Sequence, residues 1–225
     1  MLPDFYDILV ILIKYEVFIF MIYNESGKVV DVLQDIISFN NKMNKDFKYG
    51  LAINGAIDSK RNISSEDYDK LYRVVNAKQF EKQQGGICWD YVIYEADYFR
   101  KNFSSVKIKA WYIIWDKQPD YPTHTFITFK MKNKYILFES SFKAIQGVYE
   151  ADSEKDIINF VLKSMNDYPR KKKLLEEYKS HVFTYNPLDP KLPGMSCTEF
   201  MQYIEDKGRY VNHKYNSNFK VNKVN

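Results

Sequence analysis

The chain has 225 residues, of which 45% are hydrophobic, and its formal net charge is +4 at pH 7. This length is typical of one domain with a substantial core, and we expect a single domain spanning residues 1–225. Two cysteines and three histidines predict neither a disulfide framework nor a metal cluster, so we expect no metal and no other cofactor. The mildly basic charge comes with no nucleic-acid motif and no glycine-rich phosphate loop.

An apolar segment at residues 1–23 opens the chain. Four charged residues interrupt it, and the longest uncharged run, Val17–Tyr23, is too short to span a bilayer. The two early aspartates also make a poor signal-peptide start, which favours a cytoplasmic location over export. We interpret residues 4–22 as an apolar helix that docks on the core, or as a pair of strands. A contact with a partner or a membrane surface is the alternative.

The next part of the chain shows weaker patterns. They predict, in order, a turn at Asn24–Gly27, an amphipathic helix over Val29–Ile37, a loop at residues 50–63, a short capped helix from Ser64 to about Val75, and a lead-in segment at residues 76–87.

A lone cysteine follows two glycines in the middle of the chain. Cys88 comes directly after Gly85-Gly86-Ile87, and an apolar pattern with helical spacing predicts a helix over residues 88–102. The first turn of a helix favours a thiolate, because the positive end of the dipole and unpaired amides lie there. We expect the glycines to leave room for a substrate backbone. Cys88 is therefore a candidate nucleophile, with a buried structural thiol as the alternative.

Alternating patterns then predict a run of antiparallel strands. The first covers Val106–Ile114, and the next two, Tyr121–Phe129 and Tyr135–Ser140, are close enough to form a hairpin. If Lys132-Asn133 forms the two-residue turn, Met131 pairs with Lys134. Helices followed by antiparallel strands predict an α+β fold with helices packed on one antiparallel sheet.

The hairpin register brings a histidine and a carboxylate together. His124 then pairs with Ser141, and Glu139 lies on the same face as His124, at a diagonal distance of roughly 7–8 Å between backbones. A nucleophile, a base and an orienting acid thus occur in the chain order Cys88, His124, Glu139. The alternative is that His124 and Glu139 are ordinary strand residues.

These motifs resemble the transglutaminase-like superfamily, which belongs to the broader papain-like cysteine fold. The segments Gly-x-Cys-Trp-Asp, Pro-Thr-His-Thr-Phe and Phe-Glu-x-Ser-Phe are similar to those of an uncharacterised bacterial branch, and the resemblance covers roughly residues 28–206. It implies a nucleophile helix packed on an antiparallel sheet and a Cys-His-acid triad. Glu139 departs from the aspartate of most members, which predicts a looser hold on the histidine or a different strand offset.

Cys197 and His181 compete with these candidates. Ser196 and Glu199 form a capping-box pattern that places Cys197 in the first turn of a helix, where its pKa would also be depressed. No pair of glycines precedes Cys197, so we interpret it as structural. His181 begins a predicted strand and is also interpreted as structural.

The remaining elements complete the predicted domain. They are a helix capped by Ser153, a charged helix near residues 170–179, the strand from His181, the helix from Ser196, and a polar, frayed tail at about residues 207–225.

The sequence thus predicts cysteine-dependent hydrolysis or acyl transfer on an amide or peptide bond, with a peptide or protein substrate. We expect the Cys88 amide to form an oxyanion hole, with Gln83 or Gln84 as a further donor and with Gly86 and Trp89 beside the substrate. The acyl acceptor decides between a protease, an amidase or deamidase, and a transglutaminase-type enzyme. The alternatives are a non-catalytic transglutaminase-like module that binds a peptide or protein, and a basic protein associated with membranes or nucleic acid.

Overall fold

The computed structural model describes residues 22–23, 29–30, 32–53, 56–59, 65–116, 123–167 and 174–224. The chain divides into two compact units, Met1–Asp35 and Ile36–Asn225, and the second corresponds to most of the predicted domain. In the first unit, β1 (Ile22–Tyr23) pairs antiparallel with β2 (Val29–Val30). The predictions for residues 1–21 and for the turn at 24–27 lie outside the described residues.

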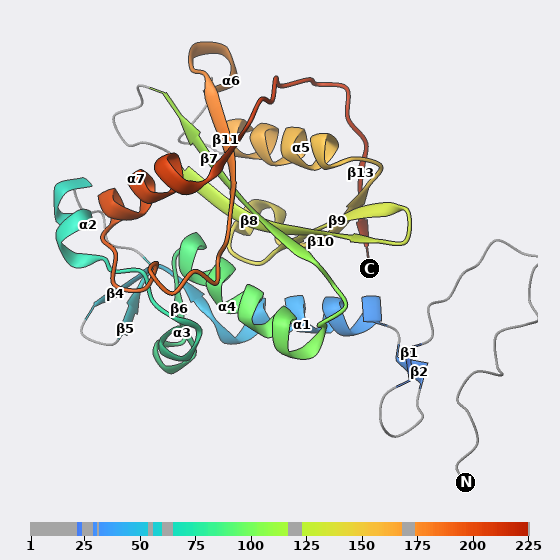
Figure 1. The fold of residues 1–225 in the computed structure, drawn as a ribbon, viewed down its shortest axis with the longest axis horizontal. Helices are drawn as coiled ribbons and strands as arrows, with labels where there is room; N and C mark the ends of the chain where they lie inside the picture. The colour runs from blue at the N-terminus through green and yellow to red at the C-terminus, as the bar shows by residue number, and fades with distance from the viewer. Residues whose placement is uncertain are drawn as a thin grey trace, which may run out of the picture. The chain divides into compact units, whose positions relative to one another are not determined.

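The second unit is built around a seven-stranded sheet of order β12-β11-β7-β8-β9-β10-β13, in which all neighbours run antiparallel (Figure 1). This arrangement confirms the predicted α+β class. The strands are β7 (Ile108–Trp115), β8 (Thr123–Met131), β9 (Lys134–Glu139), β10 (Gly147–Ala151), β11 (Ser180–Tyr185), β12 (Arg209–Val211) and β13 (Val221–Val224).

Helices cover both faces of this sheet. Figure 1 shows α5 and α6 on one side and α3 and α4 on the other. Because side chains alternate along a strand, Trp111 and Ile113 of β7 enter the core under α5, whereas Tyr112 and Ile114 pack with α4 and α7. The helices are α1 (Val32–Asp46), α2 (Ser65–Leu71), α3 (Ala77–Gln83), α4 (Cys88–Asn102), α5 (Glu154–Asp167), α6 (Leu174–Glu177) and α7 (Cys197–Lys207), with a short 3₁₀ helix at Lys143–Ile145.

Several predicted boundaries need correction. The helix predicted from Val29 begins at Val32, because Val29 and Val30 form β2. The helix predicted to reach Val75 ends at Leu71, and the lead-in segment contains α3, whose first turn is capped by the side chain of Asn76. The caps predicted at Ser153 and Ser196 are confirmed. Among the described residues, no helix combines the length and the apolar character that a membrane crossing requires.

The segment predicted as a loop at residues 50–63 contains a small hairpin instead. There β4 (Leu51–Ile53) pairs with β5 (Ala56–Asp58), while the preceding β3 (Lys48–Tyr49) pairs in parallel with β6 (Gly85–Gly86). Strands of two or three residues are too short to show an alternating pattern, which is why the sequence does not reveal them. The β3–β6 pair matters for the site, because it places β3 against the start of α4.

The C-terminal tail is ordered into strands, so the prediction of a frayed tail is wrong. Its first strand, β12, forms one edge of the sheet and its last strand, β13, forms the other, and the connecting chain passes over α5 (Figure 1). The buried Asn159 side chain of α5 accepts from His213 Nε2 at 2.9 Å and from the Asn216 amide at 3.1 Å. Edge strands expose polar side chains, so a polar composition conceals this role.

Candidate active site

The three residues of the predicted triad meet at one end of the sheet. Cys88 is the first residue of α4, His124 the second of β8 and Glu139 the last of β9. The hairpin register is the predicted one, with Met131 opposite Lys134. His124 Nε2 lies 2.7 Å from Glu139 Oε2, and the Cys88 side chain lies close enough to the His124 ring to raise its pKa. All three side chains are buried, with exposed fractions of 2–5%.

The carboxylate of Glu139 is held by its own strand end as well as by the histidine. Its Oε1 accepts from the Ser141 amide and hydroxyl, both at 2.9 Å, and from the Phe142 amide at 2.8 Å. The Glu139 carbonyl in turn accepts from Asn40 Nδ2 of α1 at 2.9 Å. The extra methylene of glutamate therefore does not give a loose hold on the histidine, which corrects that expectation.

The pair of His124 and Glu139 is charged at neutral pH. Burial lowers the pKa of His124, but the Glu139 carboxylate and the contact with Cys88 outweigh burial and raise this pKa to about 10. Burial raises the pKa of Glu139, but His124 and the donors at Ser141 and Phe142 lower it below its ordinary value. The imidazole is thus an imidazolium beside a carboxylate, with the Cys88 side chain nearby.

Asp90 fixes the start of α4 and therefore the position of Cys88. One of its oxygens accepts from the Ile87 amide at 3.0 Å, and the other accepts from the Val75 amide at 3.0 Å and the Tyr72 hydroxyl at 2.8 Å. Burial raises the pKa of Asp90 to about 7, although these three donors act in the opposite direction. The carboxyl ties the first turn of α4 to the segment that precedes α3.

The two glycines before Cys88 make room for the chain itself, not for a substrate. A Cβ on Gly86 would lie 2.5 Å from Asp90 Oδ2, and one on Gly85 would lie 2.0 Å from the Lys48 carbonyl oxygen. Gly85 also has a φ of +145°, which side chains rarely adopt. The expectation that Gly86 leaves space for a substrate backbone is therefore corrected, because β3 and Asp90 occupy that space.

Tyr49 is a functional candidate to which the sequence analysis assigns no role. Its hydroxyl lies close to Cys88: burial of the hydroxyl, followed by the charge of Cys88, raises the pKa of Tyr49 well above its ordinary value, whereas the Cys88 backbone amide acts in the opposite direction. The side chain as a whole is 47% exposed, so only its hydroxyl end is enclosed. The predicted donors are placed differently: Gln83 Nε2 donates to the Gly85 carbonyl at 2.8 Å, and Gln84 ends α3 with an exposed side chain.

Trp89 lies in the core. It is 2% exposed, stacks on Phe200 of α7 with ring centroids 4.2 Å apart, and meets Tyr72 edge to face. Its indole nitrogen has no hydrogen-bond partner among the described residues. The structure thus gives Trp89 a packing role between α4 and α7 in place of the predicted contact with substrate.

Cys197 begins α7 as predicted, but its electrostatic surroundings are the reverse of those predicted. Burial first, and then the negative charges of Asp69 and Cys88, raise the pKa of Cys197 to about 12. Asp69 accepts from the Thr198 amide at 2.7 Å, so its carboxylate takes up the helix end that was expected to favour a thiolate. The burial of the Cys197 thiol and its raised pKa support the interpretation of Cys197 as a structural residue.

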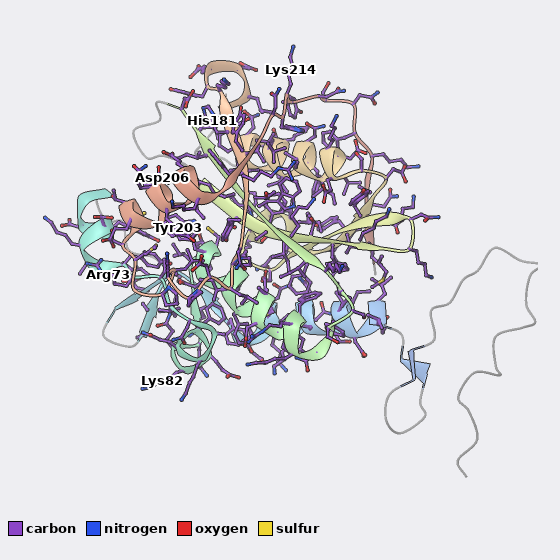
Figure 2. The ribbon with its side chains drawn as sticks, viewed as in Figure 1. Arg73, Lys82, His181, Tyr203, Asp206 and Lys214 are labelled. Atoms are coloured by element: carbon purple, nitrogen blue, oxygen red, sulfur yellow. The ribbon has the colours of Figure 1, made fainter. Side chains whose placement is uncertain are left out.

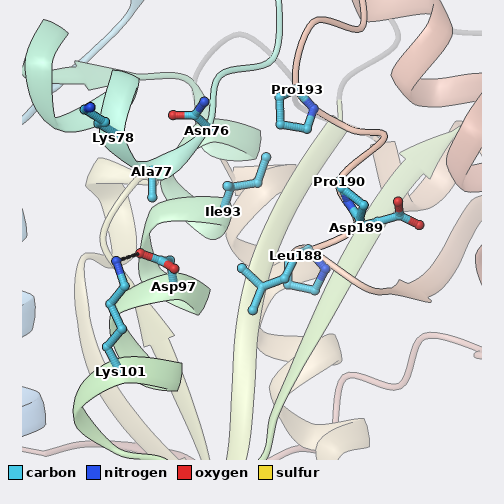
Figure 3. Close-up of a pocket in the computed structure, with 11 residues that line it drawn as sticks. Asn76, Ala77, Lys78, Ile93, Asp97, Lys101, Leu188, Asp189, Pro190 and Pro193 are labelled. Atoms are coloured by element: carbon cyan, nitrogen blue, oxygen red, sulfur yellow. Dashed lines mark ion pairs between the residues drawn. The ribbon is translucent and has the colours of Figure 1, made fainter.

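His181 takes no part in the triad. Its Nε2 lies 2.7 Å from Oδ1 of Asp116, the residue that follows β7, and Figure 2 shows His181 near the α6 end of β11. A separate cavity of about 360 Å³ lies between α3, α4 and the proline-rich loop after β11 (Figure 3). Its lining includes Ile93, Asp97 and Leu188 but no member of the triad.

Comparison with models of known protein families and with curated proteins gives no match to this chain. The geometry defines a buried Cys-His-Glu constellation in an α+β protein, with the histidine bridging the other two side chains.

Proposed function

We propose that the chain is a cysteine-dependent enzyme that acts on amide or peptide bonds through Cys88, His124 and Glu139. The observation that carries this proposal is the buried ion pair between His124 and Glu139, with the His124 ring also close to the Cys88 side chain at a helix start. We also propose a transglutaminase-like, papain-like core, because the order of nucleophile helix, histidine strand and acid strand supports that resemblance.

The proposed reaction begins with Cys88 as a thiolate beside the His124 imidazolium, because His124 already holds the proton of this pair at neutral pH. Nδ1 is the ring nitrogen available to Cys88, because Nε2 faces Glu139. The thiolate attacks the substrate carbonyl, and the imidazolium then protonates the departing amine as the C–N bond breaks. Water or a second amine, deprotonated by His124, attacks the thioester and releases Cys88. Glu139 fixes the ring orientation and stabilises its charge throughout.

Tyr49 completes the proposed oxyanion hole. In the free protein its oxygen lies beside the Cys88 amide, the donor that an oxyanion needs. When a carbonyl oxygen accepts from this amide, the phenol turns to donate a second hydrogen bond to the same oxyanion. The exposed ring of Tyr49 leaves it free to make this small movement.

A labelling experiment with matched cysteine variants tests the proposal. The protein is treated with iodoacetamide at pH 7, and modification is located by mass spectrometry. We expect fast labelling of wild type and Cys197→Ala, and no fast labelling of Cys88→Ala. Equal, slow labelling of both cysteines would contradict an activated nucleophile.

Turnover then separates the possible acceptors. A panel of peptides carrying glutamine, with and without a primary amine, distinguishes peptide cleavage, ammonia release and formation of a new amide bond. Each reaction is compared with Cys88→Ala, which should lose all of them while keeping the melting temperature of wild type to within a few degrees.

A non-catalytic peptide-binding module is the second candidate. It is favoured by one observation, namely that Tyr49 covers the amide of a thiol that is only 4% exposed. A module of this kind would bind peptides equally well with Cys88→Ala and would show no thioester intermediate with any substrate.

A further inference from the structure

A second buried carboxyl group lies beside the triad and has no part in the mechanism above. Glu95 is seven residues after Cys88 in α4, close to two helical turns, so both side chains lie on the same side of the helix. Glu95 is 2% exposed, and its Oε1 accepts from the Ser140 hydroxyl. Ser140 directly follows Glu139, so Glu95 reaches the residue next to the triad acid.

The segment of Glu139 and Ser140 is held from several sides. Asn40 of α1 donates to the Glu139 carbonyl at 2.9 Å, and Gln146 Nε2 donates to the Ser140 carbonyl at 2.7 Å. The Ser140 side chain is a further attachment, and its hydroxyl donates to Glu95 of α4. Without the hydrogen bond between Ser140 and Glu95, this end of β9 would lose an attachment to α4.

The surroundings of Glu95 oppose a negative charge. The titratable groups that face it are Glu139 from β9, His124 from β8, Tyr185 from β11 and Tyr91 from its own helix. His124 is the only cation of this set, and it is already paired with Glu139. Burial and then the Glu139 charge, opposed by the Ser140 donor and by His124, raise the pKa of Glu95 to about 8.

We propose that Glu95 is a positioning residue of the triad: it holds Ser140 and, while neutral, places no second charge beside the Glu139 carboxylate that is aligned with His124. When Glu95 loses its proton, two carboxylates share one imidazolium. The added negative charge strengthens the hold of His124 on its proton and repels Glu139. The ionisation of Glu95 in α4 therefore acts as a switch that alters the triad as the pH rises above neutrality.

The first test reads His124 directly and needs no turnover. The ring nitrogens of His124 are followed by NMR from pH 6 to pH 10 in wild type and in Glu95→Gln, whose amide oxygen still accepts from Ser140. Wild type should show a step near pH 8 in the His124 shifts, and the variant should lack it. The same curve in both proteins would overturn the proposal.

Two further variants support this test. Ser140→Ala removes the donor that favours the ionised form of Glu95, so the step in the His124 shifts should move to higher pH. A step that stays near pH 8 in this variant would also overturn the proposal, and Ser140→Ala serves as the test if Glu95→Gln does not fold. Glu154→Gln changes an exposed carboxylate paired with Lys109, and should leave the step near pH 8 in place.

A kinetic test rests on the proposed function. In wild type, kcat should fall severalfold between pH 8 and pH 9 with KM unchanged, because proton delivery by His124 is affected and binding is not. In Glu95→Gln, kcat should stay level over that range. If the wild-type protein turned over no substrate, the proposed enzymatic function would be refuted. The NMR curves would still decide whether Glu95 positions the triad.

Discussion

Replacing Glu139 by glutamine tests the ion pair at the centre of the site. The rise in the pKa of His124 from 6.5 to about 10 corresponds to a preference for the imidazolium of about 5 kcal/mol, at about 1.4 kcal/mol per pH unit. Burial acts in the opposite direction, and of the groups that raise this pKa only Cys88 would remain without the carboxylate. We therefore expect Glu139→Gln to lower the pKa of His124 and to reduce the charged form of the histidine at pH 7.

The side-chain amide of the glutamine in Glu139→Gln also reverses the direction of the hydrogen bond with His124. The glutamine oxygen can still accept from Ser141 and Phe142, but its nitrogen then faces His124 Nε2 and selects the wrong tautomer. In a serine triad the corresponding change costs about 10⁴ in turnover, and because Glu139 is firmly held we expect a loss of about 10³–10⁴. The loss of one charged hydrogen bond should destabilise the fold by about 1–3 kcal/mol, or about 2–12 °C in Tm.

The pH dependence of this stability loss identifies its cause. The contribution of His124 is fully present below pH 6.5 and is lost as the pH rises through about 10, whereas that of Glu139 is present above pH 4.5 and is lost in acid. The Tm difference between wild type and Glu139→Gln should thus be largest between about pH 4.5 and 6.5 and should shrink toward pH 10. A difference that does not change with pH, or a variant with full turnover, would refute this account; Glu154→Gln is the exposed control, with a Tm change near zero.

Four further predictions concern single features of the site and the tail. At pH 7 iodoacetamide should alkylate Cys88 at least about 10²-fold faster than Cys197, whose pKa of about 12 keeps it a thiol. Tyr49→Phe should lower kcat by about 10²–10³, as loss of one oxyanion donor does, with an unchanged Tm; an unchanged kcat would exclude the proposed role. Gly86→Ala should unfold the start of α4, because its Cβ would lie 2.5 Å from Asp90. Gly194 has open space around it, so Gly194→Ala should cost only about 1–3 kcal/mol of backbone strain. Comparison of the two Tm values checks this difference. Asn159→Ala should release residues 209–224, seen as faster hydrogen exchange there and not in β8.

Local patterns in the sequence predicted the parts of the site that depend on neighbouring residues. The start of α4 at Cys88 follows from helical spacing, and the contact of His124 with Glu139 follows from a two-residue hairpin and alternation along the strands. In both cases a short stretch of chain contains all the information needed. The α+β class is predicted for the same reason, since it depends only on the order of elements.

Residues that act across long chain separations could not be predicted in this way. Asn40 reaches the Glu139 carbonyl from 99 positions away, and Tyr49 meets Cys88 through a strand of two residues. The pKa of Cys197 is raised and not depressed because of burial and then of Asp69, which accepts from the Thr198 amide at the same helix end and is far away in the chain. None of these contacts produces a periodic pattern in the sequence, so they can be identified only in the folded structure.

The position of the triad at the ends of elements explains why its neighbours are themselves charged and buried. A helix start and a strand end leave backbone amides without partners, and a buried amide without a partner is costly. Asp90 satisfies the Ile87 amide before Cys88, and Glu139 satisfies the amides of Ser141 and Phe142 after β9. The carboxylate that orients His124 is thus also the group that ends its own strand. A substitution at Glu139 must therefore disturb both the chemistry and the local fold, which is why stability and turnover have to be measured together.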